Sequence, residues 1–249
     1  MGKGQSLAPL VLDVDALRSA FRQGPELAER VRQFRADRLG KIISNDSPIN
    51  VPDKSKIVVH IVPLNNFATR APIDLSPIRK NQALLPSLLH SGGASRINLD
   101  GILSFTYRSE TEARAYAQLF WDAAIEIVQG VLNWEVRGHN FLPEEHFDEI
   151  IQQIMKGAKA VYDTLQIQPP IAVLLTLLGM EDRKMGAGKQ YGYDSDPTFG
   201  RPEVVCPDVV LETLDSSAEE LAFPIVNLAW NAAGYDKSVF YNENGKRKT

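Results

Sequence analysis

The sequence predicts an α+β domain with a mixed or mostly antiparallel sheet, a helix layer and an N-terminal helical extension. Strand-type segments follow one another directly between residues 97 and 120, whereas other strand-type segments are separated by long helix-type segments. The 249 residues are 44% hydrophobic and 23% charged, which is the balance of a globular protein with a packed core. We expect the helical extension to occupy residues 1–50 and the α+β domain to occupy residues 51–249.

Two helices are expected at the N-terminus. Asp13 or Asp15 can cap a short helix that Gly24 and Pro25 end, and Pro25 then lies in the first turn of a second helix. The second helix carries apolar residues at spacings of three to five, which is typical of a helix with one buried stripe. These apolar residues are Leu27, Val31, Phe34, Leu39, Ile42 and Ile43.

The middle of the chain has the pattern of a sheet. Residues 57–62 form a continuous Ile/Val-rich run, which predicts a central strand covered on both faces. Residues 65–96 are rich in Pro, Ser, Asn and Gly and predict a long surface connection. Strand-type segments follow at 97–107 and 113–120, and after a possible hairpin turn at 121–124 the segment 125–132 fits either a strand or a helix.

The second half of the chain alternates helices and strands. Pro143 opens an amphipathic helix that runs to Leu165. A buried strand at 171–179, a glycine-rich charged loop at 181–202 and a strand at 203–214 follow, and a last helix runs from Ser216 or Ser217 to Gly234. Pro207 within the last strand indicates an edge position or a bulge.

Charge and cysteine content narrow the functional classes. The formal net charge of -4 and the pI of about 5.6 are not those of a dedicated nucleic-acid-binding protein. The single cysteine, Cys206, excludes an internal disulfide and an all-cysteine metal site, and we expect it in the core. No apolar run reaches the length of a membrane span, so a cytoplasmic location is expected.

A basic band on the second helix is one candidate site. Arg32, Arg35, Arg38 and Lys41 recur every third residue, and such a slanting band can follow a phosphate backbone if its side chains point outward. Acidic neighbours dilute this band. A solvated helix face with ion pairs within the helix is therefore the alternative.

A series of carboxylates is the second candidate site. Asp194, Asp196, Glu203 and Asp208 could gather around a divalent cation in a metal-dependent nuclease, or they could be solvated loop residues. The nearby GAGK at 186–189 lacks the first glycine and the final Ser or Thr of a phosphate loop, so we expect a flexible loop.

His60 lies within the apolar run 57–62, where a hydrogen-bonded histidine in the core or at a sheet end is expected more often than a catalytic base.

Several segments together resemble a known group of proteins. ERVRQFRADRLGKI, VVHIVPLNNF, RINLDGILSF, AQLFWDAAIEIV, IAVLLTLLGM and LAFPIVNLAWNAAGYDKSVFYNENGK occur in one order along the chain. In this order they resemble the region that follows the AlbA-type DNA-binding domain in bacterial Schlafen-like proteins, which are often described as ATP-binding proteins or transcriptional regulators. That region has no assigned catalytic residues, so the resemblance transfers none.

The resemblance implies a non-catalytic accessory, sensor or interaction domain that is associated with nucleic acid and acts in phage defence. Only residues 1–12 precede the first expected helix, so the partner is expected to be another protein or a separate AlbA-type domain. Two alternatives remain: a metal-dependent nuclease, and a structural subunit that docks a partner through the helix at 26–43.

Overall fold

The computed structural model describes residues 14–69, 72–81, 85, 93–131, 134–186, 197–242 and 246–248, with side chains from residue 24 onward. The helices are α1 (Val14–Ile43), α2 (Leu64–Thr69), α3 (Ser76–Lys80), α4 (Glu144–Leu165) and α5 (Ala218–Ala232). The strands of the large sheet are β1 (Lys56–Pro63), β2 (Gly93–Asn98), β3 (Gly101–Tyr107), β4 (Ala113–Phe120), β5 (Ile125–Gly130), β8 (Ile171–Leu178), β10 (Glu203–Val205) and β11 (Val209–Leu211). A small sheet contains β6 (Trp134–Val136), β7 (His139–Pro143) and β9 (Arg183–Gly186).

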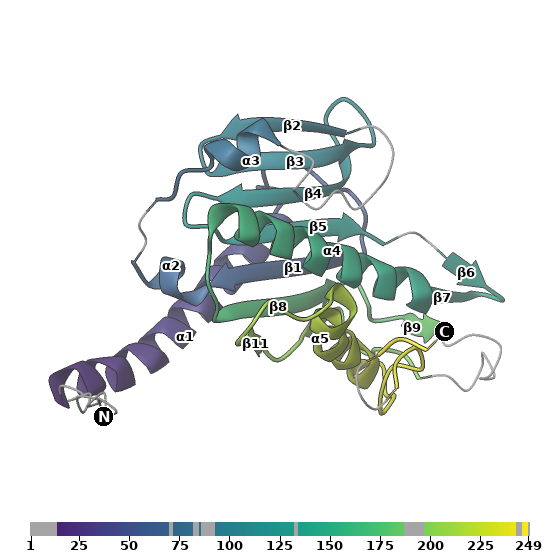
Figure 1. Cartoon of the computed structure of the whole chain (residues 1–249). Coiled ribbons are helices and arrows are strands. Elements are labelled where there is room, and N and C mark those ends of the chain that lie inside the picture. Colours follow the sequence, from purple (N-terminus) through teal and green to yellow (C-terminus); the bar gives the residue numbers. More distant parts are fainter. Residues whose placement is uncertain are drawn as a thin grey trace.

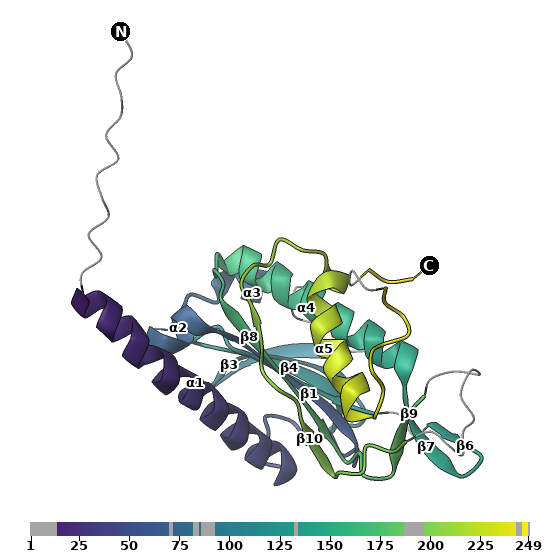
Figure 2. The same ribbon diagram turned by 90° about the horizontal axis from the view of Figure 1, so that it is seen from below.

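The large sheet is antiparallel throughout and is covered by helices on both faces. Its strand order is β10-β8-β1-β5-β4-β3-β2, and β11 also pairs with β8. Helices α4 and α5 cover one face (Figure 1), and α1 covers the opposite face (Figure 2). This architecture confirms the predicted α+β class with a mostly antiparallel sheet, a helix layer and an N-terminal helix. In the described residues no helix is long and apolar enough to cross a membrane.

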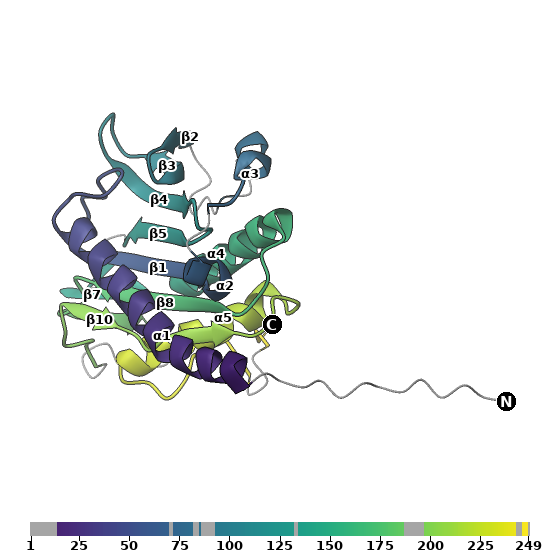
Figure 3. The ribbon, with the colours of Figure 1, turned by 90° about the vertical axis from the view of Figure 1, so that its left-hand side faces the viewer.

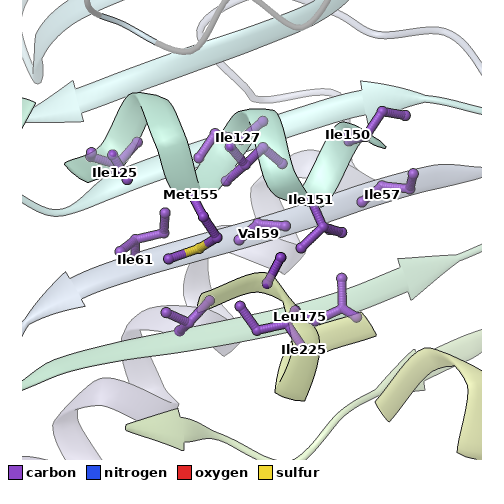
Figure 4. Close-up of a cluster of buried hydrophobic side chains, with 14 of the residues drawn as sticks. Ile57, Val59, Ile61, Ile125, Ile127, Ile150, Ile151, Met155, Leu175 and Ile225 are labelled. Carbon is purple, nitrogen blue, oxygen red and sulfur yellow. The ribbon is translucent and has the colours of Figure 1, made fainter. Parts of the chain in front are cut away.

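Strand β1 lies at the centre of the sheet, as its continuous apolar run predicts. Its alternate residues face opposite helix layers because side chains in a strand alternate in direction. Ile57, Val59 and Ile61 point toward α4 and α5 and belong to the main core (Figure 4). The neighbouring members labelled in this view are Ile125 and Ile127 of β5, Leu175 of β8, Ile150, Ile151 and Met155 of α4, and Ile225 of α5. The predicted buried strand at 171–179 and amphipathic helix from residue 143 are therefore confirmed.

Helix α1 crosses the other face of the sheet diagonally (Figure 3). It runs without a break through Pro25, so the prediction of two separate helices is wrong. Gly24 and Pro25 are both exposed, so the ring of Pro25 takes no space in the core, and the helix continues although the proline lacks a backbone N–H group. Of the predicted stripe, Val31, Leu39 and Ile42 are buried, whereas Ile43 is 52% exposed at the end of the helix.

The segment 97–107 is not one strand but the end of β2, a tight turn and β3. The Asn98 Oδ1 atom accepts hydrogen bonds from the backbone N–H groups of Asp100 at 3.1 Å and Gly101 at 2.9 Å. Gly101 adopts a φ of 145°, which a residue with a Cβ atom rarely takes. The short sequence NLDG therefore reverses the chain within an otherwise strand-like segment.

In three further segments the structure decides between alternatives or differs from the prediction. The expected surface connection at 65–96 contains α2 and α3, and its Leu75, Ile78 and Leu85 are buried in the main core. Residues 125–130 form a strand and not a helix. The expected strand at 203–214 is divided at Pro207 into β10 and β11, both of which pair with β8. The last helix begins after Ser217, as predicted, with a capping box in which Ser217 and Glu220 each accept a backbone hydrogen bond of the other.

Candidate functional site

A buried polar cluster centred on Glu126 of β5 joins α1 to the sheet. The Arg38 Nε and Nη2 atoms of α1 each donate a hydrogen bond of 2.7 Å to the Glu126 carboxylate. The Tyr116 hydroxyl of β4 donates to Oε1 at 2.8 Å, and His60 Nε2 of β1 donates to Oε2 at 3.1 Å. His60 and Glu126 have no exposed surface, and Arg38 is 6% exposed. His60 is therefore the hydrogen-bonded core histidine that the sequence predicts.

The carboxylate of this cluster is ionised despite its burial. Burial alone would raise the pKa of Glu126, but the hydrogen bonds and charges of Arg38 and His60 overcome this effect and lower it from 4.5 to about 2. Burial and the adjacent Glu126 raise the pKa of Tyr116 well above its ordinary value, so this hydroxyl stays protonated. The cluster is consequently a buried ion pair. Neutral or weakly basic groups donate the other hydrogen bonds to its carboxylate.

Two more arginines of α1 hold the helix against neighbouring segments of the fold. Arg30 Nη2 donates to the Phe67 carbonyl oxygen at 2.7 Å. Arg35 Nη1 lies 3.1 Å from the Cys206 carbonyl oxygen and 3.1 Å from the Asp208 Oδ1 atom, with its side chain 12% exposed. These contacts tie α1 to α2 and to the segment between β10 and β11.

The predicted outward-facing basic band is therefore wrong for Arg35 and Arg38. Each step of three residues falls about 60° short of a full turn around the helix axis. Successive residues of such a band therefore move around the helix and do not stay on one face. Arg32 and Lys41, the two ends of the band, are exposed. Arg32 lies 3.4 Å from Glu29, which fits the expected ion pairing within the helix.

A groove with a volume of about 490 Å³ lies beside the cluster, between α1, α2 and the turns that follow β2 and β4. Three phenylalanine rings line it: Phe67 and Phe120 lie edge-to-face against Phe34 at centroid distances of 5.4 and 5.7 Å. The Phe34 ring also contacts the His60 ring at 5.4 Å, and the Arg38 guanidinium lies 5.1 Å from the centroid of Phe120. Phe34 and Phe120 thus line the groove and also cover the buried cluster.

The charged lining of the groove is predominantly acidic. Asp37 of α1, Asp100 of the β2–β3 turn and Asp122 of the β4–β5 turn line it together with Arg30. Within the described ranges, none of the three carboxylates lies at ion-pair distance from a cation. The Arg30 Nη1 and Nη2 atoms donate to carbonyl oxygens of α2, its Nε is buried without a hydrogen-bond partner among the described residues, and its guanidinium lies 5.5 Å from the centroid of the Phe67 ring.

Trp121 forms a rigid wall of the groove. Its indole Nε1 donates to the Leu99 carbonyl oxygen at 2.8 Å, and its backbone N–H donates to the Asp100 carbonyl oxygen at 3.2 Å. Its own carbonyl oxygen accepts from the backbone N–H of Ile73 at 2.8 Å. Trp121 is 39% exposed and Leu99 is 93% exposed, so a fixed aromatic ring and a projecting aliphatic side chain border the acidic groove.

Sequence reasoning did not identify this groove. Its members come from helices α1 and α2, from Pro72 and from the residues around two turns, and such segments without glycine-rich or metal-ligand patterns carry no site signature. The sequence did carry one signal of the buried cluster beside the groove. Glu126 and His60 each interrupt an apolar strand, and the two residues are directly opposite each other in the strand register. A lone acid and a lone histidine in two such strands predict a buried partner pair when the strands are adjacent.

The carboxylate series is not brought together within the described residues. Asp194 and Asp196 lie outside them, as do residues 187–189 of the GAGK sequence. Glu203 is exposed on β10, whereas Asp208 is paired with Arg35. In the residues that the structure describes, no group of three or more His, Cys, Asp or Glu side chains could hold a metal ion.

Cys206 is buried, as expected, and burial raises the pKa of its thiol to about 11.

A second buried carboxyl group, Asp148 of α4, makes stability pH-dependent. Burial raises its pKa from 3.8 to about 6, against the lowering effects of Arg247, Tyr241 and Gln152. Because the folded protein binds this proton more tightly, the group's stabilising effect is greatest below about pH 4 and is lost as the pH rises through about 6.

We therefore expect Asp148→Asn to raise the free energy of unfolding, relative to wild type, by about 1–2 kcal/mol more at pH 7.5 than at pH 4. Urea unfolding at the two pH values measures this difference. The control is Asp163→Asn, on the same helix with a side chain that is 60% exposed. An equal effect of Asp148→Asn at both pH values would contradict the assignment.

The chain has no significant match to a protein-family model, a curated protein or a solved structure. Its own geometry therefore carries the functional proposal.

Proposed function

We propose that this chain is a non-catalytic interaction domain of the Schlafen-like AlbA group, and that its groove binds a basic side chain of a protein partner. The observation that carries the proposal is the lining of the groove. Aromatic rings form its walls, and Asp37, Asp100 and Asp122 contribute negative charge without an ion-pair partner among the described residues.

The chemistry of this lining favours a cation. A guanidinium or ammonium group over an aromatic ring gains about 0.5–2 kcal/mol, depending on how far it is desolvated. Carboxylates around the ring add charge-assisted hydrogen bonds, which are bidentate when the ligand is arginine. Trp121 and Leu99 add exposed apolar surface at the border, and aromatic residues of this kind dominate binding energy in protein interfaces.

Nucleic acid fits the same surface poorly. Three carboxylates in the groove repel phosphates, and the central arginines of α1 are engaged by Glu126 and by Asp208. A protein partner is therefore the better-supported class. A cytoplasmic setting is part of the proposal because no apolar run of the sequence reaches the length of a membrane span. Phage defence, and a partner that carries the AlbA-type domain, are part of it through the sequence resemblance alone.

The buried cluster gives the groove its shape. Arg38 of α1 is clamped to Glu126 of β5, and the rings of Phe34 and Phe120 pack against His60 and Arg38. Helix α1 is thereby held at a fixed distance from the turns after β2 and β4. A site that is preorganised in this way loses less entropy when a ligand binds.

Titration of the ¹⁵N-labelled protein with the peptide acetyl-Gly-Arg-Gly-amide tests the proposal. We expect shifts of the Trp121 indole N–H signal, and at least a tenfold weaker affinity for the same peptide with citrulline, which has a similar shape but no charge. The double variant Asp37→Asn/Asp100→Asn should reduce this preference for arginine. The control Asp46→Asn/Asp163→Asn removes the same two charges from exposed positions that do not line the groove.

Equal binding of the arginine and citrulline peptides would overturn the proposal. Salt-dependent binding of duplex DNA that is lost in Arg32→Glu/Lys41→Glu, with no shift at Trp121 on peptide addition, would favour the nucleic-acid function instead.

A further inference from the structure

A second, smaller hollow adjoins the groove at Trp121. It has a volume of about 150 Å³, and Trp121 lines both spaces. Its apolar walls are Ile73, Leu75, Ile97 and Ile102, and its polar lining is Asp74, Ser76 and Arg79. Its acidic residue Asp74 accepts hydrogen bonds from the backbone N–H and the hydroxyl of Ser76 at 2.9 and 2.8 Å, so that carboxylate is already engaged within the chain.

The size and chemistry of this hollow select a single apolar side chain. Sites for small molecules generally measure about 300–1,000 Å³, so the second hollow is too small to hold such a ligand by itself. Aliphatic walls contribute to binding by removing apolar surface from water. One leucine, isoleucine or valine side chain of a larger partner satisfies both conditions.

We infer that the partner segment carries an aliphatic side chain beside its basic one, and that the two occupy the hollow and the groove that meet at Trp121. This inference rests on the proposed function, because the basic side chain in the acidic groove is what brings the segment to the surface. The occupant is thus a protein segment with one cationic and one aliphatic anchor.

The border between the two spaces is built for such a segment. Ile97 is 49% exposed, Trp121 is 39% exposed and Leu99 is 93% exposed, and together they form an apolar rim along the β2–β3 and β4–β5 turns. The hydrogen bond from the Ile73 N–H to the Trp121 carbonyl oxygen holds the wall of the hollow in a fixed position relative to the groove. Two anchors of one segment can therefore be bound at a constant separation.

Two peptide series test the inference. Side chains on the same face are two residues apart in an extended segment and three or four apart in a helix, so the probes are Arg-Gly-Leu, Arg-Gly-Gly-Leu and Arg-Ala-Ala-Ala-Leu, each with acetyl and amide ends. Each is compared with the same peptide in which alanine replaces leucine. For at least one spacing we expect about tenfold tighter binding of the leucine peptide.

The matched variants are Ile97→Ser and Val210→Ser. Ile97 lines the small hollow, whereas Val210 of β11 has a similar exposure of 47% but lines neither space. Ile97→Ser should abolish the advantage of leucine over alanine and leave the preference for arginine over citrulline unchanged. Val210→Ser should change neither.

The outcomes separate this inference from the proposed function. If leucine and alanine peptides bind equally at every spacing while arginine is still preferred over citrulline, the inference is overturned and the proposed function stands. If the leucine advantage survives in Ile97→Ser, the aliphatic side chain lies elsewhere and the inference is again overturned. Loss of the arginine preference itself overturns both.

Discussion

Replacement of Arg38 by methionine should lower the free energy of unfolding by about 3–5 kcal/mol, because it leaves the Glu126 carboxylate buried without its cation. Methionine retains most of the volume of the side chain, so the effect reports mainly on charge and hydrogen bonding. Glu126 has no exposed surface and cannot recover hydration without moving α1 away from the sheet. Chemical denaturation at neutral pH measures the change.

A double-mutant cycle identifies the cause of this loss. Glu126→Gln should also be destabilising, but the double variant Arg38→Met/Glu126→Gln should be less destabilised than the sum of the two single changes. The control is Arg32→Met, on the same helix with a side chain that is 57% exposed, for which we expect a change within about 0.5 kcal/mol. Additive effects, or an Arg38→Met change as small as that of Arg32→Met, would contradict the role of the pair.

The same cluster predicts a specific acid dependence. The pKa of Glu126 in the folded protein is about 2 instead of 4.5, so its stabilising effect is present above about pH 4.5 and is lost as the pH falls toward 2. Arg38→Met removes the main donor to this carboxylate. The stability of the variant should consequently fall less steeply than that of wild type between these two pH values.

The second large effect is expected at Gly101, which positions the rim of the groove. A Cβ atom at this residue would lie 2.0 Å from the Leu119 carbonyl oxygen, and the backbone φ of 145° is itself unfavourable for alanine. Because the clash is with backbone, the β2–β3 turn must move to relieve it. We expect Gly101→Ala to lower the free energy of unfolding by about 3–4 kcal/mol and to weaken peptide binding at Trp121.

Gly138→Ala is the matched control for backbone strain. Gly138 also has a positive φ, of 80°, but a Cβ atom there would meet nothing within 4 Å. Gly138→Ala should therefore lower the free energy of unfolding only by the penalty for a left-handed backbone, about 1–2 kcal/mol. If the two variants are destabilised equally, close approach to the Leu119 carbonyl oxygen does not determine the need for glycine at residue 101.

Local patterns predicted those elements whose residues repeat with the period of the structure. The Ile/Val run of β1, the amphipathic helix α4 and the start of α5 at Ser217 form as expected because each is determined by neighbouring residues. The turn within 97–107 was missed although Asn98 and the dipeptide Asp100-Gly101 are turn signals, because the apolar residues on both sides were assigned to one strand. The continuation of one helix through Pro25 was also missed, because the exposure of Pro25 depends on where α1 lies on the sheet.

The candidate site was less predictable than the fold, because it is formed across distant segments. Arg38 and Lys41 look equivalent in the sequence, yet one is buried against Glu126 and the other is exposed. Phe34 was expected in the apolar stripe of α1, but its position at the groove depends on Phe67 and Phe120, which lie far away in the chain.

The amino-acid sequence by itself determined the class of fold, the central strand, the helices α4 and α5 and the core position of His60 and Cys206, because hydrophobic periodicity and composition act over a few residues. Only the tertiary structure decided which charges of α1 are buried and which carboxylates share a groove with aromatic rings. The physical reason is that the fate of a charge depends on the partners that the fold brings to it. For Arg38 that partner is Glu126, 88 residues away along the chain.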